Sequence, residues 1–198
     1  MRTGLTLSVV ITSVLIATLD ARAQTHVGIK AGTVNTNLSV SGSGSFDTDG
    51  EFGFVFGGFV SVPLGPRVRL QPEFIVSERT FSISGVTPAP SVSATAFEIP
   101  VFVQVRFGKS VQPFFQFGPQ VSVISNVTQR LPGAEVDLSD EINDVDFGMA
   151  IGGGVEVPVK RGALLFEGRA QWGFRDLSVG SDTTMRLRGV MVLAGYRF

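Results

Sequence analysis

Residues 97–107 alternate between an apolar side and a mostly polar side. The side chains of Phe97, Ile99, Val101, Val103, Val105 and Phe107 fall on one side, and those of Glu98, Pro100, Phe102, Gln104 and Arg106 fall on the other. A period of two residues is that of a β-strand, because successive side chains of a strand point to opposite faces of the sheet. This segment therefore predicts a strand that lies between two different environments.

The same alternation recurs along the chain, without a helical pattern of any length between the segments. Eight segments show it: 25–39, 51–64, 67–83, 95–107, 111–127, 145–159, 163–177 and 185–198. Short connections with Gly or Pro, at 65–66, 108–110 and 160–162, alternate with long polar ones at 40–50, 84–94, 128–144 and 178–184. This alternation of short and long connections predicts an all-β fold, an eight-stranded antiparallel up-and-down barrel. Both termini are expected at the end of the barrel that carries the short turns.

The distribution of charge predicts which face of the strands points inward. One face carries almost no charge, and only 17% of all residues are charged, against about 25% in soluble domains. A transmembrane barrel has an apolar outer face and a polar interior. We therefore expect a lumen filled by a structural polar network of Lys30, Arg67, Arg69, Glu73, Glu98, Arg106, Glu156, Glu167 and Arg169. Periodicity alone does not separate this barrel from a soluble one, in which the apolar face points inward.

The first 23 residues have the features of a secretory signal peptide. Arg2 supplies the positive charge, residues 5–19 form an apolar run, and Ala21 and Ala23 are the small residues of a cleavage site. We expect cleavage after Ala23, which leaves a barrel domain at 24–198. A membrane-anchoring helix is the alternative, but the run is shorter than the about 20 residues that a span needs.

Six sequence blocks resemble, in the same order, the porin-like outer-membrane β-barrel family common in Bacteroidetes and their relatives. The blocks are VGIKAG (27–32), FEIPVFVQVRFG (97–108), PFFQFGPQVSVI (113–124), DFGMAIGGGVEV (146–157), EGRAQWGFRDLS (167–178) and LAGYRF (193–198). The resemblance covers nearly all of 24–198. It implies an eight-stranded barrel of the OmpA or OmpX type in a Gram-negative outer membrane, and it implies no catalytic residues.

The resemblance also implies the partners of the chain. The last strand alternates outward through Val190, Val192, Ala194 and Tyr196 to the terminal Phe198. Outer-membrane barrels are recognised for insertion by this pattern, so we expect the insertion machinery to bind the C-terminal strand. The outer face should contact outer-membrane lipid and lipopolysaccharide, and we expect a monomer.

The residues predict no enzyme, cofactor or metal site. The single histidine, His26, falls at the start of the first strand, and there is no cysteine to serve as a nucleophile or thiolate ligand. A net charge of −1 gives no basic field for nucleic acid. Two acidic groups lack the spacing of a calcium loop and are interpreted as solvated loop residues: Asp47, Asp49 and Glu51, and then Asp137, Asp140, Glu141, Asp144 and Asp146.

The sequence thus favours a non-enzymatic outer-membrane protein with a structural or surface-interaction role, acting through external loops and chiefly 128–144. Two alternatives stay open at this point. A narrow porin or transporter for small solutes would show a continuous water path through the lumen. A soluble periplasmic ligand-binding barrel would turn Ile99, Val101 and Val103 inward.

Overall fold

A computed structural model of the chain describes residues 25–41, 48–83, 91–131, 134–137, 145–174 and 184–198. The predicted signal peptide lies outside these residues. Within them, no helix is long and apolar enough to cross a membrane.

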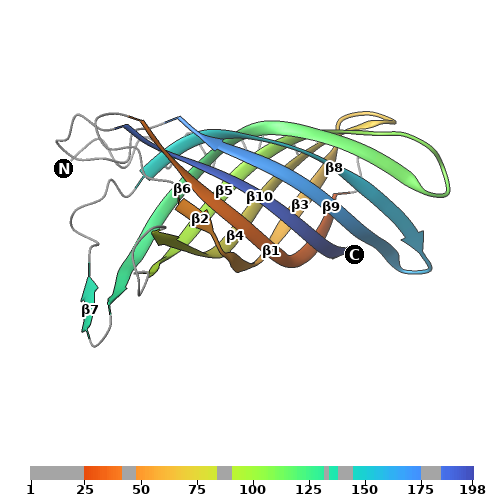
Figure 1. Cartoon of the computed structure of the whole chain (residues 1–198). Coiled ribbons are helices and arrows are strands. Elements are labelled where there is room, and N and C mark those ends of the chain that lie inside the picture. The colour runs from red at the N-terminus through yellow and green to blue at the C-terminus, as the bar shows by residue number, and fades with distance from the viewer. Residues whose placement is uncertain (1–24, 42–47, 84–90, 132–133, 138–144, 175–183) are drawn as a thin grey trace, which may run out of the picture.

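Eight long antiparallel strands form a closed wall (Figure 1). Each pairs with the next along the chain, and β1 pairs with β10, from Gly28 opposite Arg197 to Ser41 opposite Thr184. The sheet therefore has no free edge, as a strand protein in lipid requires, and the predicted eight-stranded barrel is confirmed. The strands are β1 (His26–Ser41), β3 (Phe52–Pro63), β4 (Val68–Ile83), β5 (Ser91–Arg106), β6 (Gln112–Leu131), β8 (Val145–Val159), β9 (Gly162–Gly173) and β10 (Thr184–Arg197).

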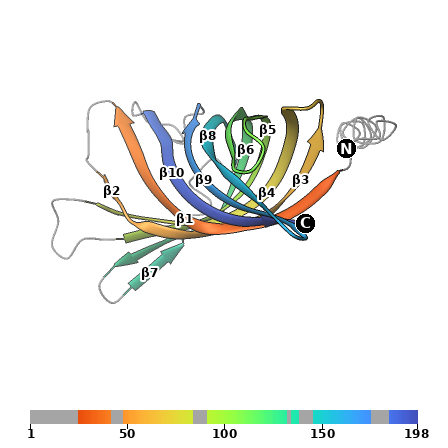
Figure 2. The same cartoon turned by 90° about the vertical axis from the view of Figure 1, so that its right-hand side faces the viewer.

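Two short strands extend the wall at one end. The strand β2 (Thr48–Gly50) pairs with the end of β4, and β7 (Ala134–Asp137) pairs with the end of β6. Figure 2 shows β7 outside the ring of long strands. The prediction of one continuous loop at 128–144 is therefore wrong at 128–131 and 134–137. The ladder continues there because a hairpin that leaves the barrel can expose both of its faces to water.

The three short turns and both ends of the barrel wall lie together at one end, called here the turn end. The turns span 64–67, 107–111 and 160–161. Gly108 takes a φ of 81°, a conformation that glycine adopts without steric cost. The amide of Phe198 donates to the carbonyl of Val27 at 2.8 Å, which joins the last residue to the first strand. The opposite end, with the longer connections, is called the loop end.

Burial alternates along the strands as the sequence predicts. On β5, the side chain of Ile99 is 51% exposed while that of Glu98 is fully buried. Apolar side chains such as Phe56, Phe166 and Val192 face outward around the wall. This arrangement is the reverse of a soluble barrel, and it is the arrangement of a barrel in lipid.

The interior also contains an apolar part that the charge pattern does not reveal. Val34, Val55, Ile75, Met191 and Leu193 are buried together as one cluster. They come from β1, β3, β4 and β10, so this cluster fills one side of the lumen. The buried polar side chains, together with other apolar ones such as Phe59, Phe102 and Phe114, occupy the rest of the lumen, and these polar side chains form the candidate site.

Candidate functional site

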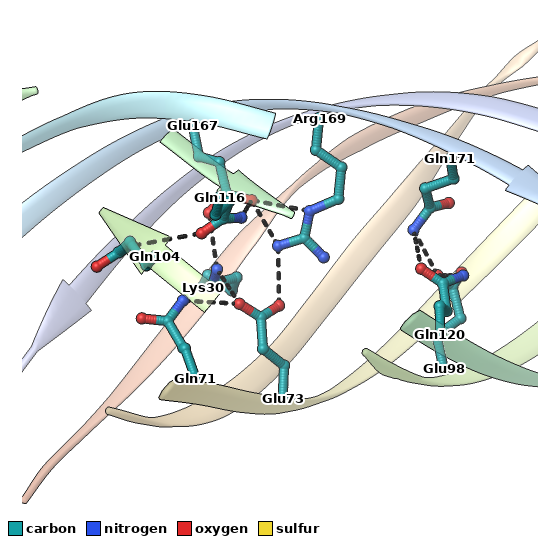
Figure 3. A network of polar contacts seen from close by, with 10 residues as sticks. All are labelled: Lys30, Gln71, Glu73, Glu98, Gln104, Gln116, Gln120, Glu167, Arg169 and Gln171. Atoms are coloured by element: carbon teal, nitrogen blue, oxygen red, sulfur yellow. Dashed lines mark hydrogen bonds and ion pairs between the residues drawn. The ribbon is translucent and has the colours of Figure 1, made fainter. Parts of the chain in front are cut away.

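The centre of the lumen holds two cations and two carboxylates that contact one another, here called the central layer (Figure 3). The ammonium of Lys30 lies 2.8 Å from an oxygen of Glu73 and 2.8 Å from an oxygen of Glu167. The guanidinium of Arg169 lies 2.8 Å from the second oxygen of Glu73 and also pairs with Glu167. All four side chains are almost fully buried. The layer is neutral, which buried charges require.

Three glutamines add hydrogen bonds to the central layer. The Gln71 amide donates to Glu73 at 2.8 Å, and the Gln116 amide donates to Glu167 at 2.7 Å. Gln104 donates in turn to the carbonyl oxygen of Gln116 at 3.3 Å. These amides come from β4, β5 and β6, whereas Lys30 comes from β1 and Arg169 from β9, so the layer reaches across the lumen.

Each cation of the central layer also lies over an aromatic ring. The ammonium of Lys30 lies 5.0 Å from the centre of the Phe59 ring, and the guanidinium carbon of Arg169 lies 4.6 Å from the centre of the Phe102 ring. A cation over a ring face gains about 2 kcal/mol or more when it is desolvated. Both cations are thus held by carboxylates and by a ring, which orients them in the lumen.

A second layer lies toward the loop end and is centred on Glu98. Its carboxylate accepts hydrogen bonds from the Ser77 hydroxyl at 2.7 Å, the Gln171 amide at 2.8 Å and the Gln120 amide at 3.0 Å, and it pairs with Arg79. A carboxylate with several donors and a cation keeps its charge in a buried site. These residues come from β4, β5, β6 and β9, so this layer also crosses the barrel.

A third layer lies at the turn end, where three arginines surround one carboxylate. Glu156 of β8 lies 2.6 Å from Arg197, 3.1 Å from Arg69 and 3.6 Å from Arg106. These side chains are slightly more exposed than those of the central layer, up to 14% for Arg106. The turn-end layer therefore carries more positive than negative charge and borders on solvent.

Little space remains between these side chains toward the loop end. A cavity of about 10 Å³ lies between Arg79, Gln120, Ser122, Asp146 and Gln171. That volume is about the space for the centre of one water molecule. In the part of the barrel that the structure describes, the lumen is thus filled by paired side chains at this level.

The structure places eight of the nine predicted lumen residues inside the barrel, and Arg67 is the exception. Arg67 lies in the 64–67 turn with its side chain exposed. Its backbone carbonyl accepts the amide proton of Arg106 at 2.8 Å. The prediction is wrong there because the alternation of faces begins only at Val68, where β4 begins.

Several lumen residues are absent from the predicted set. Arg79 and Arg197 are buried and pair with Glu98 and Glu156. Alternation could have found both, since Arg79 shares a face with Ser77 on β4, and Arg197 lies between two outward aromatic residues. The uncharged partners are Gln71, Ser77, Gln104, Gln116, Gln120, Ser122 and Gln171.

The remaining candidate residues lie in two places. The Nδ1 atom of His26 lies 3.1 Å from the carbonyl oxygen of Phe198, at the turn-end rim and outside the lumen layers. The interpretation of Asp146 as a solvated loop residue is wrong: it is buried on the inner face of β8, within the strand that the alternation predicts at 145–159. Residues 138–144 lie outside the described residues.

Comparison with known proteins identifies the type of barrel. The family model of the outer membrane protein β-barrel domain matches residues 20–179. No curated protein sequence matches the chain.

Solved structures match over most of their length at low identity, which shows the fold alone. OprG from Pseudomonas aeruginosa matches with a TM-score of 0.54 and 12% identity, over 89% of this chain and 97% of that one. Ail from Yersinia pestis, solved with the heparin analogue sucrose octasulfate, matches with a TM-score of 0.50 and 13% identity, over 88% of this chain and 99% of that one. Neisserial surface protein A matches with a TM-score of 0.50 and 14% identity, over 86% of this chain and 95% of that one.

Proposed function

The chain belongs to the outer membrane protein β-barrel domain family, and we propose that it is a non-conducting, non-enzymatic barrel that acts through its loop end. The observation that carries this proposal is the central layer. Lys30, Glu73, Glu167 and Arg169 are mutually paired and almost fully buried in the middle of the lumen. A barrel built to pass solutes would keep polar groups in contact with water at this level.

The energetics of the central layer support a closed lumen. Each cation contacts both carboxylates, so any opening wide enough for an ion has to separate several buried pairs at once. Loss of one partner from a buried pair costs about 3–5 kcal/mol. Eight strands enclose just enough space for side chains to fill. The lumen therefore serves as the core of the barrel.

The turn end is proposed to face the periplasm and the loop end the exterior. Short turns at the periplasmic side and longer loops outside are the rule for such barrels. In this orientation, export through a signal peptide cleaved after Ala23 brings the chain to the membrane from the periplasmic side. The C-terminal strand ending at Phe198 would then be presented to the insertion machinery, while the outer face contacts lipid and lipopolysaccharide.

The distribution of reactive groups supports a non-enzymatic role. The one histidine of the chain, His26, lies at the rim and is not among the lumen layers. The lumen carboxylates Glu73, Glu98 and Glu167 each contact cations or amides. A general base needs a lone pair that can reach a substrate, and these carboxylates are held by their partners inside the lumen.

The closed ring of strands leaves no sheet edge that a second copy would have to cover, which supports a monomer.

Planar-bilayer recording tests the closed lumen. The wild-type barrel is expected to carry no steady current. A variant with Lys30, Glu73, Glu167 and Arg169 all replaced by Ala keeps the lumen's net charge, and it is expected to conduct. Heat-modifiable migration in detergent gels checks that both proteins are folded. A large stable current through the wild-type barrel would overturn the proposal in favour of the narrow porin.

A further inference from the structure

An open groove lies on the outer face of β1, β10 and β9, which are side by side in the wall (Figure 1). Its volume is about 520 Å³. Its outward lining includes the small residues Ala31, Gly168 and Ala194, and at Gly168 an added Cβ would meet no atom within 4 Å. The outward residues that line it are Ala31, Thr33, Phe166, Gly168, Val192 and Ala194.

A second, more polar groove of about 190 Å³ continues the first toward the loop end. Arg188, Trp172 and Asn35 line it, together with Ala170 and Val190. The two grooves adjoin, because Gly168 opposite Val192 and Ala170 opposite Val190 are successive outward pairs of one ladder. Arg188 lies directly opposite Trp172 in the ladder, so the guanidinium and the indole ring both line the loop end of the second groove.

Arg188 lies at the edge of the apolar surface. It precedes Phe198, at the turn-end rim, by ten residues on the same outward row. At about 3.4 Å per residue and a tilt of about 40°, this corresponds to about 26 Å along the barrel axis. The apolar band of such barrels is about 25 Å tall. Arg188 and Trp172 are thus placed at the boundary between acyl chains and head groups, where Trp is preferred.

We propose that the two grooves together bind one phosphorylated glycolipid of the outer leaflet. A phosphate binds Arg188, a sugar ring lies against Trp172, and an acyl chain follows the apolar groove over Gly168. The guanidinium favours phosphate because its parallel N–H groups match two phosphate oxygens. The choice of the outer leaflet rests on the orientation given under Proposed function, and the closed lumen plays no part in it.

The position of Arg188 favours a lipid over a second copy of the chain. Two barrels that paired through this face about an axis along the membrane normal would place their Arg188 side chains at the same level. Like charges that face each other in an interface cost several kcal/mol. A phosphate neutralises the same cation.

Trp172 provides the measurement, because it is the only tryptophan of the chain. The full-length barrel is folded in zwitterionic micelles at low salt, and its emission is followed during titration with lipid A. A saturable change of emission is expected. Dephosphorylated lipid A tests the phosphate contact, and phosphatidylglycerol tests whether a phospholipid serves equally well.

Two substitutions separate the head-group contact from the acyl-chain contact. Arg188→Gln is expected to weaken lipid A binding by about tenfold or more, and Arg188→Lys to restore part of it. Gly168→Phe places a ring in the apolar groove at a position where the added Cβ meets no atom within 4 Å, and it is expected to weaken binding as well. The matched controls are Arg161→Gln, in a turn at the far end, and Gly58→Phe, on the outer face of β3.

The outcomes are distinct. Loss of binding in both test variants, with both controls unchanged, supports the site. Equal binding of dephosphorylated lipid A or phosphatidylglycerol overturns it, and so does binding that survives Arg188→Gln. A concentration-dependent dimer that Gly168→Phe abolishes would assign the groove to a second copy instead. A current through the lumen would overturn the closed barrel without affecting these results.

Discussion

Glu73 and Arg169 meet in the middle of the barrel at 2.8 Å, although 96 residues separate them in the chain. Glu73 belongs to β4 and Arg169 to β9, which lie on different sides of the lumen. Their contact therefore requires that the sheet has closed. Lys30 and Glu167 complete the same neutral group. Formation of the Glu73–Arg169 pair therefore indicates that the whole sheet has closed.

The first prediction concerns the charge balance of the central layer. Glu73→Gln is expected to lower the free energy of unfolding by about 3–5 kcal/mol, because Lys30 and Arg169 then share one carboxylate in a buried site. Urea unfolding in detergent micelles, followed by heat-modifiable gel migration, measures this loss.

A double variant provides the control for that prediction. Adding Lys30→Met to Glu73→Gln restores neutrality, so the double variant should be more stable than Glu73→Gln alone although it retains fewer contacts. If the second substitution lowers stability further, the individual contacts matter more than the balance of charge.

The second prediction concerns close packing of the strands. A Cβ at Gly118, on the inner face of β6, would lie 1.9 Å from the carbonyl oxygen of Val101. Gly118→Ala is therefore expected to lower the free energy of unfolding by about 1–3 kcal/mol, because the backbone has to shift. Gly168→Ala adds the same methyl group where no atom lies within 4 Å, and it should change stability by less than about 0.5 kcal/mol. Equal effects of the two substitutions would contradict this account.

The third prediction tests the direction of side chains with a single reactive thiol. The chain contains no cysteine, so each introduced residue is the only target. Val192 is 64% exposed and Leu193 is 2% exposed on the same strand. When each cysteine is labelled with a nitroxide before folding into lipid vesicles, the label on Val192→Cys should collide with oxygen dissolved in the lipid, and the label on Leu193→Cys should be shielded from it. The opposite order would mean that the faces are assigned wrongly.

The fourth prediction separates insertion from stability at Phe198. Its ring packs at 5.0 Å against that of Tyr196, and its amide bonds to Val27. Phe198→Ala keeps the backbone hydrogen bond, so folding in micelles should lose no more than about 1 kcal/mol. Assembly in cells should fall several-fold, because the terminal aromatic residue is proposed to be read by the insertion machinery. If assembly in cells falls only as much as the loss of stability in micelles explains, Phe198 is not recognised by the insertion machinery.

Alternation in the sequence predicts the strands and their faces well, because both are local properties. Ile99 and Glu98 differ in burial as their positions in the alternation require. The same rule fails at Arg67, where a turn replaces the strand. At Asp146 the alternation is right, because it predicts a strand from residue 145, and only the interpretation of the acidic run as solvated loop residues is wrong.

The partners of the lumen residues could not be predicted in the same way. The sequence shows that Arg79 and Glu98 share the inner face, but the contact between them depends on the register of β4 against β5. The apolar cluster of Val34, Val55 and Met191 likewise has no charge pattern to mark it. The outer groove over Gly168 depends on three adjacent strands whose small residues align only in the folded sheet.

The sequence by itself determined that the chain forms eight strands with one apolar and one polar face, because the period of two and the separation of charged from apolar residues are local properties of the sequence. The tertiary structure decided that the apolar face points outward. Only the tertiary structure decided that Glu73 pairs with Lys30 and Arg169, and that Glu156 is surrounded by arginines. The physical reason is closure. Joining β1 to β10 sets the tilt and register of every strand, and these determine which inward side chains meet across the lumen.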